Sequence, residues 1–196
     1  MYDRWYHFPV SSRAGYVLVG GKSSRMGRDK ALLPFRGTTL AQNIAEAVRA
    51  AAGSVSLVGS PFRRENLGYE VTPDLYPGEG PMGGILTALQ NSTADWNLIV
   101  ACDMPALSAD FLRQLLDAAD RYDADALLPQ GPSGRPEPLC AVYHRRSRRS
   151  LDAAFARGVR KVTAALGEVR SVIWPVAEVL YFQNVNTPED WASYDR

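Results

Sequence analysis

Short apolar runs alternate along this chain with longer stretches in which apolar residues recur at helical spacing. The clearest helical stretch is residues 39–52, whose apolar face consists of Leu40, Ile44, Ala47, Val48 and Ala51. Thr39 and Gln42 have the spacing of a capping box at its start, and Gly53 follows its last turn. The pattern therefore predicts a helix that begins at Thr39 and ends before Gly53.

The other elements follow the same alternation. Strands are expected near residues 16–19, 55–58, 69–71, 97–101, 126–128, 139–143 and 169–174. Further helices are expected at residues 83–90, after Ser108, before Gly158, before Gly167, and after Thr187, where Pro188 takes the first helical position. This β-α-β order predicts an α/β fold with a mostly parallel sheet.

The chain is long enough for one domain, with an N-terminal leader. Residues 1–15 lack the apolar segment of a secretory signal and are expected to be loosely ordered. Residues 16–196 are expected to form a single domain. The Gly- and Pro-rich segment 130–138 separates a regular first half, residues 16–128, from a less regular second half, residues 129–196.

Charge and cysteine content exclude several classes of protein. The 22 Lys and Arg residues nearly balance the 21 Asp and Glu residues, so no large positive field draws the protein to nucleic acid or anionic lipid. No apolar run approaches the roughly 18–20 residues that span a bilayer. Cys102 and Cys140 are too few for a disulfide framework, which favours a reducing, cytoplasmic location.

The most informative segment is LVGGKSSRMGRDK, residues 18–30. Gly20 and Gly21 follow a predicted buried strand, and glycine lets backbone N–H groups approach a phosphate or a base closely. Arg25 and Lys30 add the positive charge that a nucleoside triphosphate requires. The segment therefore predicts a nucleotide-binding loop at the carboxyl end of a strand.

Two other glycine motifs offer alternatives. The end of a Walker A loop is suggested by residues 21–23, but Tyr16 stands where that motif needs its first glycine. Residues 78–83 satisfy G-x-G-x-x-G, and Asp103 follows twenty positions later, as in dinucleotide-binding proteins. Pro73 and Pro77 separate those glycines from the preceding predicted strand, so NAD binding remains an alternative.

Residues 18–30 resemble the L-x-G-G-x-x-x-R-M-G-x-D-K signature of molybdenum cofactor guanylyltransferases, which belong to the Rossmann-like nucleotidyltransferases. Further matches in the family's order are Asp74, residues 80–84 (GPMGG), 102–105 (CDMP), 135–136 (RP) and 184–190 (NVNTPED). The resemblance covers about residues 16–195. It implies a Rossmann-like three-layer nucleotidyltransferase fold with a mostly parallel central sheet.

The resemblance implies transfer of GMP from GTP to the phosphate of molybdopterin, with release of pyrophosphate. It implies a Mg²⁺ ion on Asp103, and catalytic roles for Arg25, Lys30 and Asp103. The implied GTP-binding residues are Leu18, Val19, Gly20, Gly21, Arg25, Lys30, Asp74, Gly83 and Asp103.

The resemblance also implies that the second substrate binds to the other half of the chain. Residues 16–128 would bind the nucleotide and residues 129–196 the molybdopterin, through Arg135, Asn184 and Asn186. Molybdopterin-delivering proteins or molybdoenzymes are expected as transient partners, whereas nucleic acid and membranes are not.

Two positions depart from the family pattern. Gly59 stands where members often have Asn, and Val19 stands where alanine is usual. Gly21 favours GTP, because relatives that use CTP typically read L-A-A-G at this loop. A cytidylyltransferase, a guanylyltransferase with another phosphorylated acceptor and a non-catalytic nucleotide-binding module remain alternatives.

Two other charged segments have simpler interpretations. The basic run in residues 145–161 favours a solvated helix face, with attraction of the pterin phosphate as the alternative. Asp123 and Asp125 imitate a D-x-D metal motif, but they precede a predicted strand, which favours a polar turn.

Overall fold

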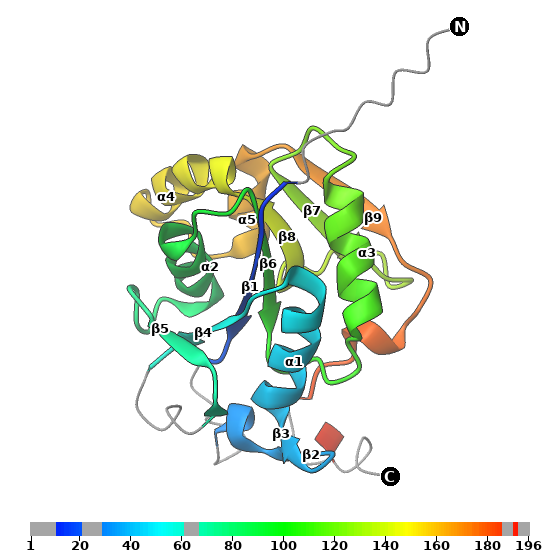
Figure 1. Cartoon of the computed structure of the whole chain (residues 1–196). Helices are drawn as coiled ribbons and strands as arrows, with labels where there is room; N and C mark the ends of the chain where they lie inside the picture. The colour runs from blue at the N-terminus through cyan, green and yellow to red at the C-terminus, as the bar shows by residue number, and fades with distance from the viewer. Residues whose placement is uncertain (1–10, 21–28, 61–66, 186–189, 192–196) are drawn as a thin grey trace, which may run out of the picture.

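The computed structural model describes residues 11–20, 29–60, 67–185 and 190–191 (Figure 1). Its centre is a seven-stranded sheet in the order β5-β4-β1-β6-β8-β7-β9. The strands are β1 (Arg13–Leu18), β4 (Ser56–Gly59), β5 (Glu70–Pro73), β6 (Trp96–Ala101), β7 (Ala126–Gln130), β8 (Cys140–His144) and β9 (Ser171–Pro175). A hairpin of β2 (Pro34–Phe35) and β3 (Thr38–Thr39) forms a separate small sheet.

All neighbouring strands of the large sheet are parallel except where β8 is involved. β8 runs antiparallel to both β6 and β7, whereas β1 is parallel to β4 and β6, and β7 is parallel to β9. The prediction of an α/β fold with a mostly parallel sheet is thus confirmed. The reversal at β8 brings the start of that strand to the edge where β1 and β6 end.

Helices cover both faces of the sheet (Figure 1). α1 (Leu40–Ala52) and α3 (Ala109–Ala119) pack with Val17 on one face. On the other face, α2 (Gly80–Asn91), α4 (Arg148–Ala156) and α5 (Val162–Ala165) pack with Tyr16 and Leu18. Successive side chains of β1 therefore enter opposite cores, as expected for a strand buried on both faces. Short 3₁₀-helices are η1 (Lys30–Leu32), η3 (Arg145–Ser147), η4 (Leu166–Glu168) and η5 (Leu180–Phe182).

Local sequence signals define the ends of α1 and α3. Thr39 and Gln42 form the predicted capping box, and Gly53 ends α1 in the left-handed conformation with φ of 82°. The Ser108 hydroxyl accepts the Phe111 N–H at the start of α3. These predictions are confirmed. α2 begins at Gly80, earlier than the predicted residue 83.

The predicted C-terminal limit of the leader, residue 15, is wrong. β1 begins at Arg13, because Arg13 pairs with Trp96 of β6, and the Ser12 hydroxyl donates to Asp95 just before that strand. Residues 1–10 lie outside the described residues. So does most of the helix predicted from Thr187, of which only residues 190 and 191 are described, as helical.

The order of the strands creates a crevice at one edge of the sheet. From β1 the chain moves outward to β4 and β5, and then crosses back through α2 to β6 on the other side of β1. Ligands of open α/β sheets bind at such a switch point, beyond the carboxyl ends of the strands. Among the residues described, no helix is long and apolar enough to span a membrane.

Candidate active site

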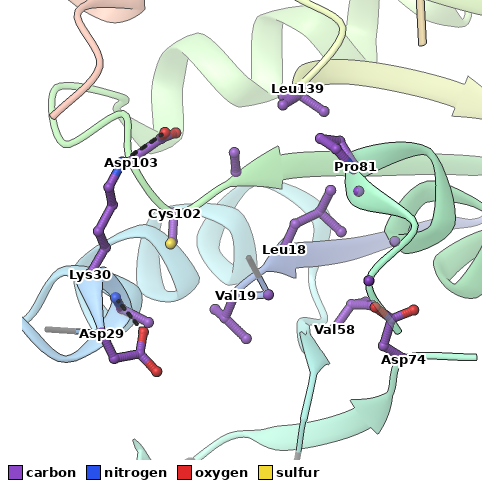
Figure 2. A pocket seen from close by; sticks show the side chains of 16 residues that line it. Leu18, Val19, Asp29, Lys30, Val58, Asp74, Pro81, Cys102, Asp103 and Leu139 are labelled. Carbon is purple, nitrogen blue, oxygen red and sulfur yellow. Dashed lines mark hydrogen bonds and ion pairs between the residues drawn. The ribbon is translucent and has the colours of Figure 1, made fainter. Parts of the chain in front are cut away.

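A cavity of about 440 Å³ lies at the carboxyl ends of β1, β4 and β6 (Figure 2). Its apolar wall includes Leu18, Val19, Val58 and Leu139. Its charged lining residues are Asp29, Lys30, Asp74 and Asp103. Figure 2 shows Lys30 and Asp103 facing each other at one end and Asp74 at the other. The predicted residues Leu18, Val19, Gly20, Lys30, Asp74 and Asp103 are thus brought together around one space.

Lys30 and Asp103 form the first end of the cavity. Lys30 begins η1, which Asp29 caps by accepting the Ala31 N–H through its side chain. Lys30 Nζ lies 4.0 Å from Asp103 Oδ2, and the two side chains are 19% and 25% exposed. Burial raises the pKa of Asp103, and the positive charge of Lys30 partly offsets that rise. A carboxylate in this position gains from an additional cation.

A second acidic group, Glu137, lies on the same side. Burial raises the pKa of Glu137, the negative charge of Asp103 raises it further, and the charge of Arg135 lowers it. The sequence does not identify Glu137 as a site residue. No sequence pattern indicates that the loop before β8 returns to the end of β6. The Ala101 N–H donates to the Leu139 carbonyl and fixes that return.

The C-terminal segment also reaches Asp103. The Val185 N–H donates to the Asp103 carbonyl at 2.8 Å. Asn184 is exposed and lies next to this contact, and Arg135 is exposed in the loop before β8. Both residues predicted for molybdopterin therefore lie in segments that interact with the Asp103 side of the site. Asn186, the third, lies outside the described residues.

Asp74 is held firmly at the opposite end. Asp74 Oδ1 accepts the Tyr76 N–H at 2.9 Å and the Thr87 hydroxyl at 3.1 Å. The Asp74 N–H donates to the Gly59 carbonyl at 3.2 Å, which ties the residue to the end of β4.

The glycines around the cavity have different roles. Gly84 lines the cavity, and a Cβ there would lie 3.1 Å from Leu18 Cδ2. Gly83 is not among the lining residues. A Cβ on Gly83 would come within 2.8 Å of Tyr76 Cβ, so this glycine allows α2 to pack against the loop that follows Asp74. The structure thus places Gly83 beside the predicted nucleotide pocket and Gly84 on its wall.

The two departures from the family pattern are in contact. A Cβ on Gly59 would lie 3.1 Å from Val19 Cγ2 and 3.3 Å from the Gly20 nitrogen. Val19 therefore fills part of the space that a side chain at position 59 would need.

The dinucleotide fingerprint does not have the required setting. Residues 74–77 separate Gly78 from β5, whereas the fingerprint needs its glycines directly after the strand. Gly78 and Gly80 have positive φ and line the same cavity, so they shape its rim. Of the glycine-loop residues predicted to bind GTP, Gly21 and Arg25 lie outside the described residues.

The charged segments outside the cavity are paired internally. Arg146 forms ion pairs with both Asp123 and Asp125, which confirms the interpretation of this D-x-D segment as a polar turn. Other arginines of the basic run pair as Arg145 with Asp95, Arg148 with Asp152, Arg157 with Glu168, and Arg160 with Glu79. Across the described ranges, no three His, Cys, Asp or Glu residues form a group able to hold a metal by themselves.

Comparison with known proteins identifies the family of this chain. Residues 15–169 match the family model of the MobA-like NTP transferase domain. A protein of Deinococcus radiodurans named probable molybdenum cofactor guanylyltransferase is 33% identical, with 90% of each chain covered.

Two solved structures share the fold. Molybdopterin-guanine dinucleotide biosynthesis protein A of Archaeoglobus fulgidus has a TM-score of 0.79 and 28% identity, covering 92% of this chain and 96% of its own. Rv0371c of Mycobacterium tuberculosis in complex with manganese has a TM-score of 0.66 and 19% identity, covering 92% and 96%. The family match spans most of the chain, including most of β1, all of β6 and the described residues that line the cavity, and this protein therefore belongs to the MobA-like NTP transferase family.

Proposed function

We propose that this protein transfers GMP from GTP to the terminal phosphate of molybdopterin, forming molybdopterin guanine dinucleotide and releasing pyrophosphate. The observation that carries the proposal is the cavity at the sheet switch point, with Lys30 and Asp103 at one end and Asp74 at the other. Relatives of similar length that are named probable molybdenum cofactor guanylyltransferase support the choice of reaction.

The charges decide how GTP would lie in the cavity. The triphosphate needs cations, and Lys30 provides one beside Asp103. Asp74 would repel phosphate but can accept N–H or O–H groups, so the nucleoside part belongs at that end. We therefore assign GTP binding to Leu18, Val19, Gly20, Gly21, Arg25, Lys30, Asp74, Gly84 and Asp103, with Gly84 in place of Gly83 on the wall.

A divalent metal ion is implied by the family, and the residues present fit one. Asp103 offers a carboxylate that is 25% exposed and carries a raised pKa, so a cation would relieve its buried charge. Mg²⁺ is usually held by one or two carboxylates together with substrate phosphates and water, and we propose Mg²⁺ on Asp103. When bound, the ion would offset negative charge on the phosphates.

The remaining chemistry belongs to the protein's own side chains. A phosphate monoester has a second pKa of about 6, so the attacking phosphate is largely ionised at neutral pH and needs no activated Ser, Cys or His. Lys30, together with Arg25, would stabilise the negative charge that develops on the leaving pyrophosphate. Positioning and charge stabilisation are then the protein's main contributions.

The acceptor would approach from the Asp103 side. Asn184 is connected to that side through the Val185–Asp103 hydrogen bond, and Arg135 through its charge interaction with Glu137. We propose that Arg135, Asn184 and Asn186 face molybdopterin, and that proteins delivering or receiving the pterin contact this edge transiently. Two cysteines are too few for the disulfide framework of a small secreted protein, so a cytoplasmic location is part of the proposal.

The reaction can be tested by measuring pyrophosphate release with Mg²⁺, GTP and molybdopterin. Asp103→Asn is expected to lower kcat at least about 100-fold, the scale of losing one electrostatic contributor to a transition state. Asp110→Asn is the matched control, because Asp110 is exposed on α3 and pairs with Arg113 away from the cavity.

Each result separates the alternatives. Turnover with CTP in preference to GTP would identify a cytidylyltransferase. GTP binding without turnover on any phosphorylated acceptor would identify a binding module. Full activity of Asp103→Asn would contradict the proposed site.

A further inference from the structure

Thr87 connects the core of α2 to the rim of the cavity. Its side chain is fully buried, and its hydroxyl donates to Asp74 Oδ1 at 3.1 Å. The same hydroxyl accepts the Leu75 N–H at 3.1 Å. The one hydroxyl proton is therefore committed to Asp74, and a neighbouring backbone N–H fixes the orientation of the oxygen.

The two carboxylate oxygens of Asp74 differ in the hydrogen bonds that they accept. Oδ1 accepts both the Thr87 hydroxyl and the Tyr76 N–H. Within the part of the chain that the structure describes, no group donates to Oδ2. Two donors on one oxygen prevent the carboxylate from rotating and leave the second oxygen for a ligand in the cavity that Asp74 lines.

Because Thr87 is buried, loss of its hydroxyl would deprive polar groups of hydrogen-bond partners. Removing the hydroxyl would leave the Leu75 N–H without its acceptor and Oδ1 with only one donor. Thr87 lies in α2 between Leu86 and Ala88, which are also fully buried. Its hydroxyl is located by its hydrogen bonds with Asp74 and Leu75. A rigid helix thus sets the direction of a carboxylate on a loop.

We propose that Thr87 is a positioning residue for nucleotide recognition, holding Asp74 so that Oδ2 accepts an N–H or O–H group of the nucleoside. The inference rests on the proposed function for the identity of the ligand as GTP. Thr87 does not touch the ligand and acts only through Asp74.

The test is calorimetric titration of GTP in the presence of Mg²⁺ into the full chain and a set of variants. Thr87→Val keeps the shape of the side chain and removes the hydroxyl, and it is expected to weaken GTP binding about tenfold, the scale of one hydrogen bond to a charged group. Thr87→Ser restores the hydroxyl and is expected to bind within about threefold of wild type. Thr163→Val is the control, because Thr163 is an exposed helical threonine on α5.

A double-mutant cycle separates positioning from general damage to the fold. In an Asp74→Asn background, Thr87→Val is expected to change GTP binding less than about twofold, because its effect passes through Asp74. The KM for GTP should rise in Thr87→Val while kcat changes little, since Asp74 lies at the opposite end from Lys30 and Asp103. Thermal unfolding of each variant shows whether it is folded at the assay temperature.

The inference is overturned if Thr87→Val binds GTP as wild type does, or if its effect is equally large in both backgrounds. It is also overturned if Thr87→Ser fails to restore binding. Wild-type protein that binds GTP but transfers nothing to molybdopterin would overturn the proposed function, and the variant series would still decide the role of Thr87. Wild-type protein that binds no nucleoside triphosphate would overturn both.

Discussion

Asp125 belongs to a segment that imitates a D-x-D metal motif, and its contacts stabilise the sheet, in line with the polar turn that the sequence favours. It accepts the Arg170 N–H at 3.0 Å and forms an ion pair with Arg146. Its own carbonyl accepts the His144 N–H at 2.8 Å. One residue thus connects the starts of β7 and β9 with the end of β8.

These contacts predict a pH-dependent contribution to stability. Burial alone would raise the pKa of Asp125, but hydrogen bonds from the Arg170 N–H and the Arg146 side chain outweigh it, and the pKa is lowered. A lowered pKa in the folded state means that the stabilisation is present above the unfolded value, about 3.9, and is lost as pH falls through the folded value. Asp125→Asn should therefore cost about 1–2 kcal/mol at pH 7 and much less near pH 2.5.

Urea unfolding of wild type and Asp125→Asn at both pH values provides the measurement. Ionisable groups other than position 125 are shared by the two proteins, so their effects largely cancel in the difference. If the difference in free energy of unfolding between the two proteins stays constant with pH, the charge of Asp125 is not the cause of the lost stability.

Individual site residues could be predicted where a motif coincides with the end of a strand. Asp74 and Asp103 meet this condition, and Lys30 closes the motif that starts at the end of β1. The structure brings all three to one cavity. Gly83 and Gly84 are adjacent in the sequence, and only the packing of α2 against Tyr76 distinguishes their roles. Glu137 lies in a loop whose position depends on the direction of β8.

At the level of elements, the loop between β5 and α2 is braced from outside by the corner after α4. Arg160 forms an ion pair with Glu79, and its guanidinium lies 3.8 Å from the centre of the Phe155 ring. The Phe155 and Tyr76 rings meet edge to face at 4.9 Å. The same loop carries Asp74 and the rim glycine Gly78, so its mobility affects the cavity.

Arg160→Ala should loosen this loop without unfolding the protein. The Arg160–Glu79 pair is about two-fifths exposed, so its loss should cost less than about 1 kcal/mol of global stability. Hydrogen exchange of the amides in residues 75–80 should accelerate, while that of α1 stays unchanged.

Arg157→Ala is the control, because the guanidinium of Arg157 pairs with Glu168 in the same corner, whereas Arg160 pairs with Glu79 of the loop. If the amides of residues 75–80 exchange equally slowly in wild type and Arg160→Ala, the corner after α4 does not hold the loop.

Most regular elements could be predicted because their local signals agree with the fold. α1 has an apolar face, a capping box and a terminal glycine, and each contributes to the same helix. The strands of the β2–β3 hairpin contain two residues each, too few to show an alternating pattern. β8 could be recognised as a strand, but its antiparallel direction follows from pairing with β6 and β7, which residue periodicity does not encode.

The molecule as a whole buries two apolar cores on the two faces of one sheet, and the cavity lies where the central strands of that sheet end. β1 and β4 contribute lining residues to the cavity and side chains to both cores. Because this arrangement exists only in the folded chain, a ligand that binds the cavity binds the native state and not the unfolded chain.

GTP with Mg²⁺ should therefore raise the melting temperature. At a free concentration 100 times Kd, binding to the native state adds about 2.7 kcal/mol, which for a chain of this size corresponds to roughly 5–10 °C. Thermal scans with increasing GTP and with CTP at the same concentrations provide the measurement. A larger shift with CTP would contradict the assignment of guanine.

The hydrogen bond from Val185 to Asp103 also has a consequence for how the enzyme is made. Among the residues that the structure describes, those that line the cavity precede position 140, so the ribosome makes them before the segment of Asn184. Domains generally fold from the N-terminal end during synthesis. The nucleotide pocket is therefore encoded ahead of the acceptor side, and a chain whose synthesis stops before Val185 lacks the contact that secures the acceptor segment against Asp103.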